Sequence, residues 1–139
     1  MLRSTVLTSL LAAAALTTAA CGDDDPVGPS LPTPIAITET FSDTLNPNGG
    51  RTHPFATERA GEVIAVLTSL APNAEGTIGL SLGTWNGSSC QIIIAKDNAT
   101  IAAGTVIGSA TGTGAFCVRI YDVGQLTQSA DYTVTVQHF

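Results

Sequence analysis

The strongest constraint on the fold is a series of short, β-like segments separated by turns. From residue 35 onwards, runs rich in Val, Ile and Thr alternate with clusters of Gly, Asn, Asp and Ser, which is typical of strands and their connections. No amphipathic helical period separates them, and Asp97–Ala103 has room for one helical turn at most. The expected strands are Ile35–Thr44, Thr52–Thr57, Glu62–Leu70, Thr77–Leu82, Ser89–Ala95, Gly104–Ala110, Ala115–Val123 and Ala130–His138. Their spacing of about ten residues predicts an all-β domain, a sandwich of two antiparallel sheets packed face to face.

The apolar pattern within these segments predicts which side chains share the core. Phe116, Val118 and Ile120 alternate with polar or mixed residues, so a strand places them together on one face. The same alternation occurs in Thr77–Leu82 and Ala130–His138. We therefore expect these three strands to supply most of the interior.

Other segments are expected to differ in how they are covered. Glu62–Leu70 is almost wholly apolar, as in a strand that is covered on both faces. The continuous run Ile92–Ile94 is likewise predicted to lie in the core. Pro54 cannot donate a ladder hydrogen bond, so its strand is expected at a sheet edge or at a bulge.

Cys90 and Cys117 are the only cysteines downstream of Cys21, and each lies inside an expected strand. In an exported protein such a pair predicts a disulfide bond. The alternative is a zinc site, which would also need His53 and His138, and these four residues contain no closely spaced pair of ligands. We therefore expect no metal and no cofactor.

The N-terminus has the features of an export signal. Met1–Arg3 is a short basic region, and the 17 residues Ser4–Ala20 carry no charge, which is too short for a spanning helix. Small residues directly before Cys21 resemble the lipobox of bacterial lipoproteins, although Thr18 stands where these signals favour Leu. This resemblance implies that 1–20 is removed and that Cys21 carries acyl chains such as palmitate. An ordinary secretory signal cleaved at an Ala-x-Ala-like site is the alternative.

Residues 21–34 are expected to form a tether between the lipidated cysteine and the domain at 35–139. The segment holds four of the seven prolines and the consecutive acids Asp23–Asp25, so it cannot bury enough apolar surface to fold. Fully extended, it would reach about 40 Å. A calcium site would need six or more oxygens in fixed geometry, so a solvated run of charge is the simpler interpretation.

The order of several short motifs is similar to that of the bacterial pre-peptidase C-terminal domain. The resemblance spans residues 36–138 and implies a jelly-roll-like sandwich without catalytic residues, a type of domain that is commonly appended to exported enzymes. Here no enzyme domain is attached, which implies a free-standing copy. The matching segments are Phe41, Leu45, Gly49–Gly50, His53–Phe55, Ala60–Val63, Leu67–Leu70, Gly114–Asp122 and Tyr132–Val136.

Charge and side-chain chemistry exclude several classes of function. After Cys21 the chain has four basic residues against 11 acidic ones, a net charge of −7, so nucleic acid is not an expected partner. Neither histidine lies in a recognisable nucleophile motif; His53 is expected to be half-buried and His138 exposed. The pair Asp122 and Gly124 is expected to form a turn, with a calcium site as the alternative. The chain is predicted not to be an enzyme.

Trp85, in a polar loop, is the one residue whose type suggests ligand contact. Its ring could stack on a sugar or anchor a protein, or it could fold over the rim of the core. The expected function is a non-catalytic module, binding or structural, presented by an exported lipoprotein and tethered to a bacterial membrane through Cys21. Its partner would be a protein or polysaccharide of the envelope. The alternative is a carbohydrate-binding or accessory module for a separately encoded exported enzyme.

Overall fold

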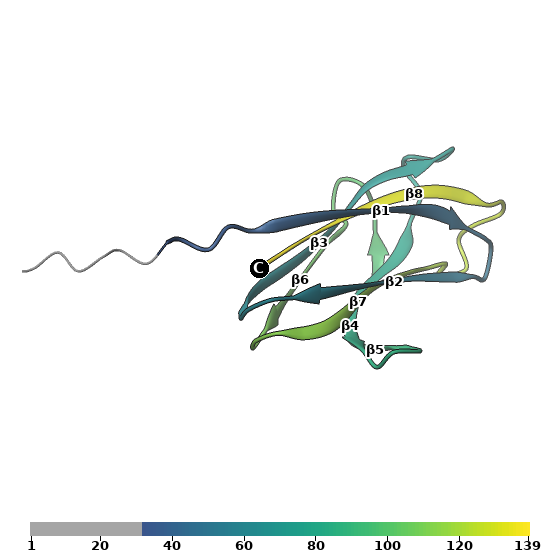
Figure 1. Cartoon of the computed structure of the whole chain (residues 1–139). Coiled ribbons are helices and arrows are strands. Elements are labelled where there is room, and N and C mark those ends of the chain that lie inside the picture. The colour runs from purple at the N-terminus through teal and green to yellow at the C-terminus, as the bar shows by residue number, and fades with distance from the viewer. Residues whose placement is uncertain (1–31) are drawn as a thin grey trace, which may run out of the picture. The chain divides into compact units, whose positions relative to one another are not determined.

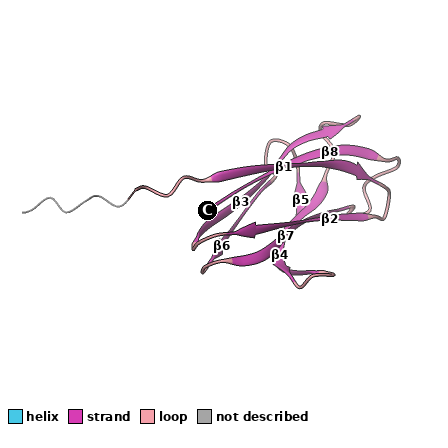
Figure 2. Cartoon of the chain, viewed as in Figure 1, coloured by secondary structure: helices cyan, strands magenta, loops and turns pink. Residues whose placement is uncertain are grey.

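The computed structural model describes residues 32–139, which form eight β-strands in two antiparallel sheets and contain no helix (Figures 1 and 2). The fold class predicted from the sequence is therefore confirmed. The predicted signal (1–20), Cys21 and nearly all of the tether lie outside the described residues. The strands are β1 (Ile37–Leu45), β2 (Gly50–Thr57), β3 (Gly61–Ala71), β4 (Ile78–Trp85), β5 (Cys90–Ala99), β6 (Thr105–Ala110), β7 (Gly114–Tyr121) and β8 (Ala130–His138).

The order of the strands is that of a jelly roll. One sheet has the order β1-β8-β3-β6 and the other β2-β7-β4-β5. Every connection except the β4–β5 hairpin passes from one sheet to the other. Consequently β1 lies beside β2 along one side of the sandwich, and β6 lies beside β5 along the other. These two sides are called the β1–β2 edge and the β5–β6 edge below.

The interior consists of the alternating rows predicted from the sequence. Leu80 in β4, Val118 and Ile120 in β7, and Val134 and Val136 in β8 are fully buried. They come from facing strands of the two sheets, because β8 is central in one sheet and β7 and β4 are central in the other. The predicted strand phase is therefore confirmed for these three strands. Phe116, at the end of the same row, is only partly buried against the core.

Two predictions about coverage were wrong. In β3 only alternate residues are fully buried, including Val63, Ala65 and Leu67, while Ile64 and Val66 are half-buried. One face of this strand meets the core, and nothing among residues 32–139 fully covers the other. The second error concerns Ile92–Ile94, which are exposed rather than buried.

Pro54 lies in β2, which is an edge strand as predicted. Strand β2 pairs with β7 on one side and has no partner among the described strands on the other, whereas β7 also pairs with β4. Because a proline cannot donate to a further strand, β2 is a poor template for additional pairing.

Asp122 fastens the loop that follows β7. Its carboxylate accepts hydrogen bonds from the backbone N–H groups of Asn48, Gly124, Gln125 and Leu126 at 2.7 to 3.1 Å. Partial burial alone would raise the pKa of Asp122, but these four donors outweigh it and hold the pKa below its ordinary value. Gly124 has φ +84°, a conformation that favours glycine. The predicted turn is thus present, and the Asp122 carboxylate stabilises it by accepting hydrogen bonds from the backbone.

Candidate binding edge on strands β5 and β6

Strand β5 exposes apolar side chains on both of its faces. Ile92, Ile93 and Ile94 are 45%, 71% and 40% exposed. Since successive side chains of a strand point to opposite faces, neither face of this segment is covered. Figure 1 shows the end of the β4–β5 hairpin projecting from the rest of the sandwich. Exposed apolar edge strands are sites where other chains bind or aggregate.

The local irregularity of the β4–β5 hairpin accounts for this exposure. The register between β4 and β5 shifts twice, between Ile78 and Leu80 and between Leu82 and Gly83. At Gly83 a Cβ atom would collide with the Gln91 carbonyl, so β5 crosses directly over the glycine. Bulges of this kind bend a strand away from its sheet, which carries the isoleucines beyond the core.

A small apolar cleft lies between β5 and β6. It has a volume of about 40 Å³ and is lined mainly by Val63, Leu82, Ile93, Ile94 and Phe116. By this measure one water needs about 10–15 Å³, so the cleft has room for a short aliphatic group.

Gly108 in β6 contributes to this cleft through its missing side chain. A Cβ atom there would lie 3.6 Å from Leu82 Cδ1 and 4.0 Å from Ile94 Cγ2, at ordinary contact distance. A larger side chain at residue 108 would therefore begin to fill the cleft. Ile107, its neighbour in the strand, is 51% exposed and extends the apolar surface along β6.

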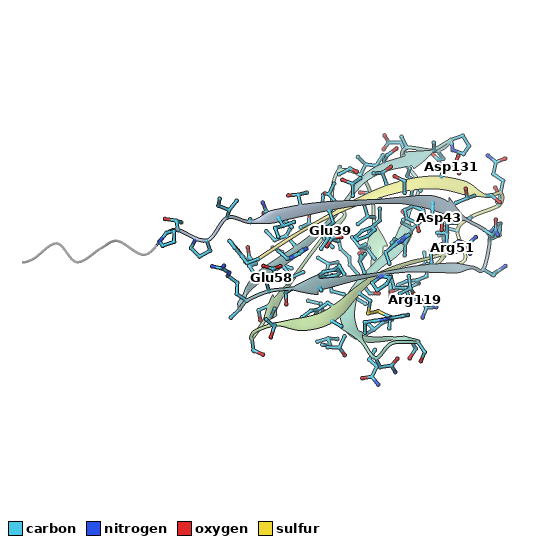
Figure 3. All side chains as sticks on the ribbon, in the orientation of Figure 1. Glu39, Asp43, Arg51, Glu58, Arg119 and Asp131 are labelled. Carbon is cyan, nitrogen blue, oxygen red and sulfur yellow. A yellow bond between two sulfur atoms is a disulfide. The ribbon has the colours of Figure 1, made fainter. Side chains whose placement is uncertain are left out.

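Strands β5 and β6 carry little charge of their own, although the exposed Glu62 of the neighbouring strand β3 pairs with Ser109 of β6. Between Gly76 and Val118 only Lys96 and Asp97 are charged. Asp97 accepts a hydrogen bond from the Tyr121 hydroxyl, so it has a partner of its own. The charged side chains labelled in Figure 3 lie on β1, β2, β7 and β8 or, for Glu58, just after β2. Protein interfaces are depleted of charge in the same way at their centres.

The predicted disulfide is present and holds the start of β5 in place. The sulfur atoms of Cys90 and Cys117 are bonded, and their Cα atoms lie 5.8 Å apart. The two strands are not neighbours, because β4 lies between β5 and β7. The bond is possible because β5 crosses over Gly83, which pairs with Cys117 in the adjacent strand. Cys117 is fully buried.

Trp85 ends β4 beside the disulfide and is half-buried. The turn that follows is held by Asn86, whose side-chain oxygen accepts hydrogen bonds from the backbone N–H groups of Ser88 and Ser89 at 3.0 and 2.8 Å. The polar groups beside the tryptophan are therefore engaged with one another. Stacking of a sugar on this ring stays a prediction.

The side chain of Tyr121 closes the other end of the same face. Its ring lies on Gly79 in β4, and the Arg119 guanidinium is 5.8 Å from the ring centroid. Burial, followed by the hydrogen bond to Asp97, raises the pKa of Tyr121 to about 12. It therefore remains a neutral hydrogen-bond donor across the physiological pH range.

Both histidines have partners near the β1–β2 edge: His53 is on the edge strand β2, and His138, on the central strand β8, lies beside Glu39 of β1. His53 is half-buried, as expected; its ring is stacked on Phe41 with centroids 5.0 Å apart, and its Nε2 shares a hydrogen bond of 2.7 Å with the Tyr132 hydroxyl. Burial lowers the pKa of His53, although the nearby Asp43 carboxylate acts in the opposite direction.

The prediction that His138 is exposed was wrong. Its side chain is only 2% exposed, packs near Phe55 with ring centroids 5.2 Å apart, and lies 2.9 Å from Glu39 Oε1 through Nε2. Its place near the end of the sequence suggested exposure, but β8 is a central strand paired on both sides. The Nδ1 atom has no hydrogen-bond partner among the described residues.

A polar hollow of about 300 Å³ opens beside β1 and β8, but its two carboxylates already have partners. Asp43 Oδ2 lies 3.3 Å from the Arg51 Nε, and Asp131 Oδ1 accepts a hydrogen bond of 2.6 Å from the Thr44 hydroxyl. In residues 32–139, no three metal-ligating side chains are grouped as a metal site requires.

The sequence matches no known family model and no curated protein. Nor does the part of the chain from residue 32 to 139 contain a helix that could cross a membrane. The isoleucine run is apparent in the sequence, but its pattern predicts a place in the core. The signals that could have revealed it as a surface are the scarcity of charge from β4 to β7 and the glycine in β6.

Proposed function

We propose that this chain is a non-catalytic lipoprotein of the bacterial cell envelope, whose sandwich binds another protein surface through the β5–β6 edge. The observation that carries the proposal is the exposure of Ile92, Ile93 and Ile94 on both faces of an edge strand. A stable monomer gains nothing from leaving these side chains in water, because burying one fully is worth about 1.5–3 kcal/mol. Covering them with a partner would recover part of this energy.

The chemistry of the edge favours a protein over a polysaccharide. Sugars are held by hydrogen bonds and by open aromatic faces, whereas the exposed side chains here are aliphatic and the polar groups near Trp85 bond to each other. A strand that is free on one side can also pair with an extended segment of a partner through backbone hydrogen bonds, with alternate side chains entering pockets. The cleft beside Ile94 is such a pocket.

The proposed absence of catalysis is supported by how the histidines are used. His53 bonds to Tyr132 and His138 to Glu39, so each Nε2 is engaged with a group other than a serine or a cysteine. A nucleophile of the serine-hydrolase type would need a ring nitrogen within hydrogen-bond reach.

Site-specific photo-crosslinking in the native envelope tests the binding proposal. The full-length chain would carry p-benzoylphenylalanine in place of Ile93, with a matched control in which Thr40, an exposed residue of β1, is replaced. We expect a discrete protein adduct from residue 93 that the control does not give. If residue 93 yields no protein adduct, or both variants yield the same ones, the β5–β6 edge is not a binding site.

A second experiment tests the anchor. Cys21→Ala should shift the protein from the membrane fraction to the soluble fraction, because two or more acyl chains give stable attachment and their loss leaves none. Metabolic labelling with a fatty-acid analogue should mark the wild type and not the variant. An unlabelled wild-type protein would contradict the lipoprotein assignment.

A further inference from the structure

We propose that the protein bound at the β5–β6 edge is a second copy of this chain, with the two β5 strands paired antiparallel about a two-fold axis at Ile93. This inference rests on the proposed function, since it names the partner of the same surface. Pairing of this kind would join two four-stranded sheets into one continuous sheet. It is an isologous contact, so it closes after two copies.

The distribution of charge favours association of two copies of this chain at the β5–β6 edge. The chain as a whole is acidic, so most approaches between two copies bring like charges together and are unfavourable. The β5–β6 edge is different because Lys96 and Asp97 are the only charged residues from Gly76 to Val118, and Asp97 already bonds to Tyr121. Two copies can therefore pair edge to edge at β5 with little electrostatic repulsion.

The sequence of β5 selects one register. In an antiparallel pair centred on Ile93, this residue meets its symmetry mate, and Ile92 of each copy pairs with Ile94 of the other. No other register pairs all three isoleucines only with isoleucines. The two copies of Lys96 would then be six residues apart along the ladder, or about 20 Å, which is beyond the Debye length of about 8 Å in physiological salt.

The other three edge strands are less suited to this pairing. Strand β2 contains Pro54, which interrupts a ladder. Strand β1 carries Glu39 and Asp43, and pairing of two β1 strands about a point between these residues would place each acid opposite an acid of the other copy. Strand β6 has six residues against ten in β5. Charged side chains, proline, short length and β-bulges are the usual protections of an edge. Strand β5 has the two register shifts described above, one of them at Ile93, but it has neither a proline nor a short length, and its charged residues lie only near its end.

The disulfide also favours binding by β5. Because Cys90 is bonded to Cys117 in the central strand β7, the start of β5 is fixed before any partner arrives. A strand that is already ordered loses less conformational freedom on association. The exposed segment is thus prepared for pairing.

The experiment uses two full-length copies with different affinity tags, expressed together in the native envelope. Each carries p-benzoylphenylalanine in place of Gln91, an exposed residue of β5 that the register brings opposite Ala95 of the other copy. We expect an adduct of twice the chain mass that contains both tags. The adduct should fall at least about tenfold when both copies carry Ile93→Asp, because two carboxylates then meet at the axis, and it should return when Ile93→Asp is mixed with Ile93→Lys.

Ile37→Asp is the matched control, because Ile37 is an exposed isoleucine on β1 and its replacement should leave the adduct unchanged. The inference is overturned if the adduct persists with Ile93→Asp in both copies, or if the Asp and Lys mixture does not restore it. Adducts only with other proteins would also overturn it while leaving the proposed function intact. Adducts only with lipid, or none at all, would overturn both.

Discussion

The two edges of the sandwich differ in what fills the space between the sheets. At the β1–β2 edge, alternate side chains of the two strands face each other and bridge the sheets with polar and aromatic contacts. Phe41 stacks on His53, which bonds to Tyr132, and Asp43 pairs with Arg51. At the β5–β6 edge the corresponding space holds a small cleft beside Ile94.

Burial in this fold therefore depends on what faces a strand and not on how apolar the strand is. Strand β1 has few apolar side chains and yet its Phe41 packs on the core, whereas β5 has three consecutive isoleucines and none is buried. An edge that carries its own bridging residues is complete within one chain. The β5–β6 edge lacks such bridges and is therefore the place where a second chain can contribute them.

The largest effect is expected from comparing a truncation at each edge. Tyr132→Ala removes a fully buried aromatic side chain and should lower the free energy of unfolding by about 3–5 kcal/mol. Ile93→Ala at the opposite edge should change it by no more than about 0.5 kcal/mol in the monomer. Urea unfolding of the dilute full-length chain measures both. Equal losses would show that the β5–β6 edge is as well packed as the other.

The next largest effect concerns the disulfide that holds β5. Replacing both Cys90 and Cys117 by Ala should lower the free energy of unfolding by about 3 kcal/mol, because the crosslink joins two residues that are 27 positions apart in the sequence. Hydrogen exchange should show that the amides of β5 lose more protection than those of β1. A uniform loss across both edges would contradict the view that the bond chiefly fixes β5.

A smaller effect is expected from the bridge between the sheets at the β1–β2 edge. Tyr132→Phe keeps the buried ring but leaves His53 Nε2 without its 2.7 Å partner, which should cost about 1 kcal/mol. Thermal or urea unfolding detects this difference. If Tyr132→Phe is neutral, the hydrogen bond does not stabilise this edge.

The smallest effect is the response to pH. Burial lowers the pKa of His53 in the folded chain, so the unfolded state binds the proton more readily. The contribution of His53 is present above its ordinary pKa of about 6.5 and is lost as the pH falls through the lower folded value. Wild-type stability should therefore decline more between pH 7 and pH 5 than that of His53→Phe. Parallel pH profiles for the two chains would contradict this.

Much of the fold could be predicted because the alternation of apolar and polar residues along a strand indicates which side chains share a face. The positions of all eight strands, the core rows of β4, β7 and β8, and the edge position of β2 followed from residue patterns and from Pro54. The disulfide followed from having two cysteines in expected strands. The lipid anchor at Cys21 and any role of Trp85 in binding sugars remain predictions.

The residue pattern was enough to predict the eight strands, the phase of β4, β7 and β8, and the pairing of Cys90 with Cys117, because these depend on neighbours along the chain or on the number of cysteines. Which faces of the strands are covered depends on how the two sheets pack and could not be predicted from the sequence. The isoleucines of β5 were left exposed by two register shifts and by an outer place in the sheet, and His138 was buried because β8 is central. The physical reason is that coverage depends on strands far apart in sequence, and a local pattern of apolar residues carries no information about which of them will lie opposite.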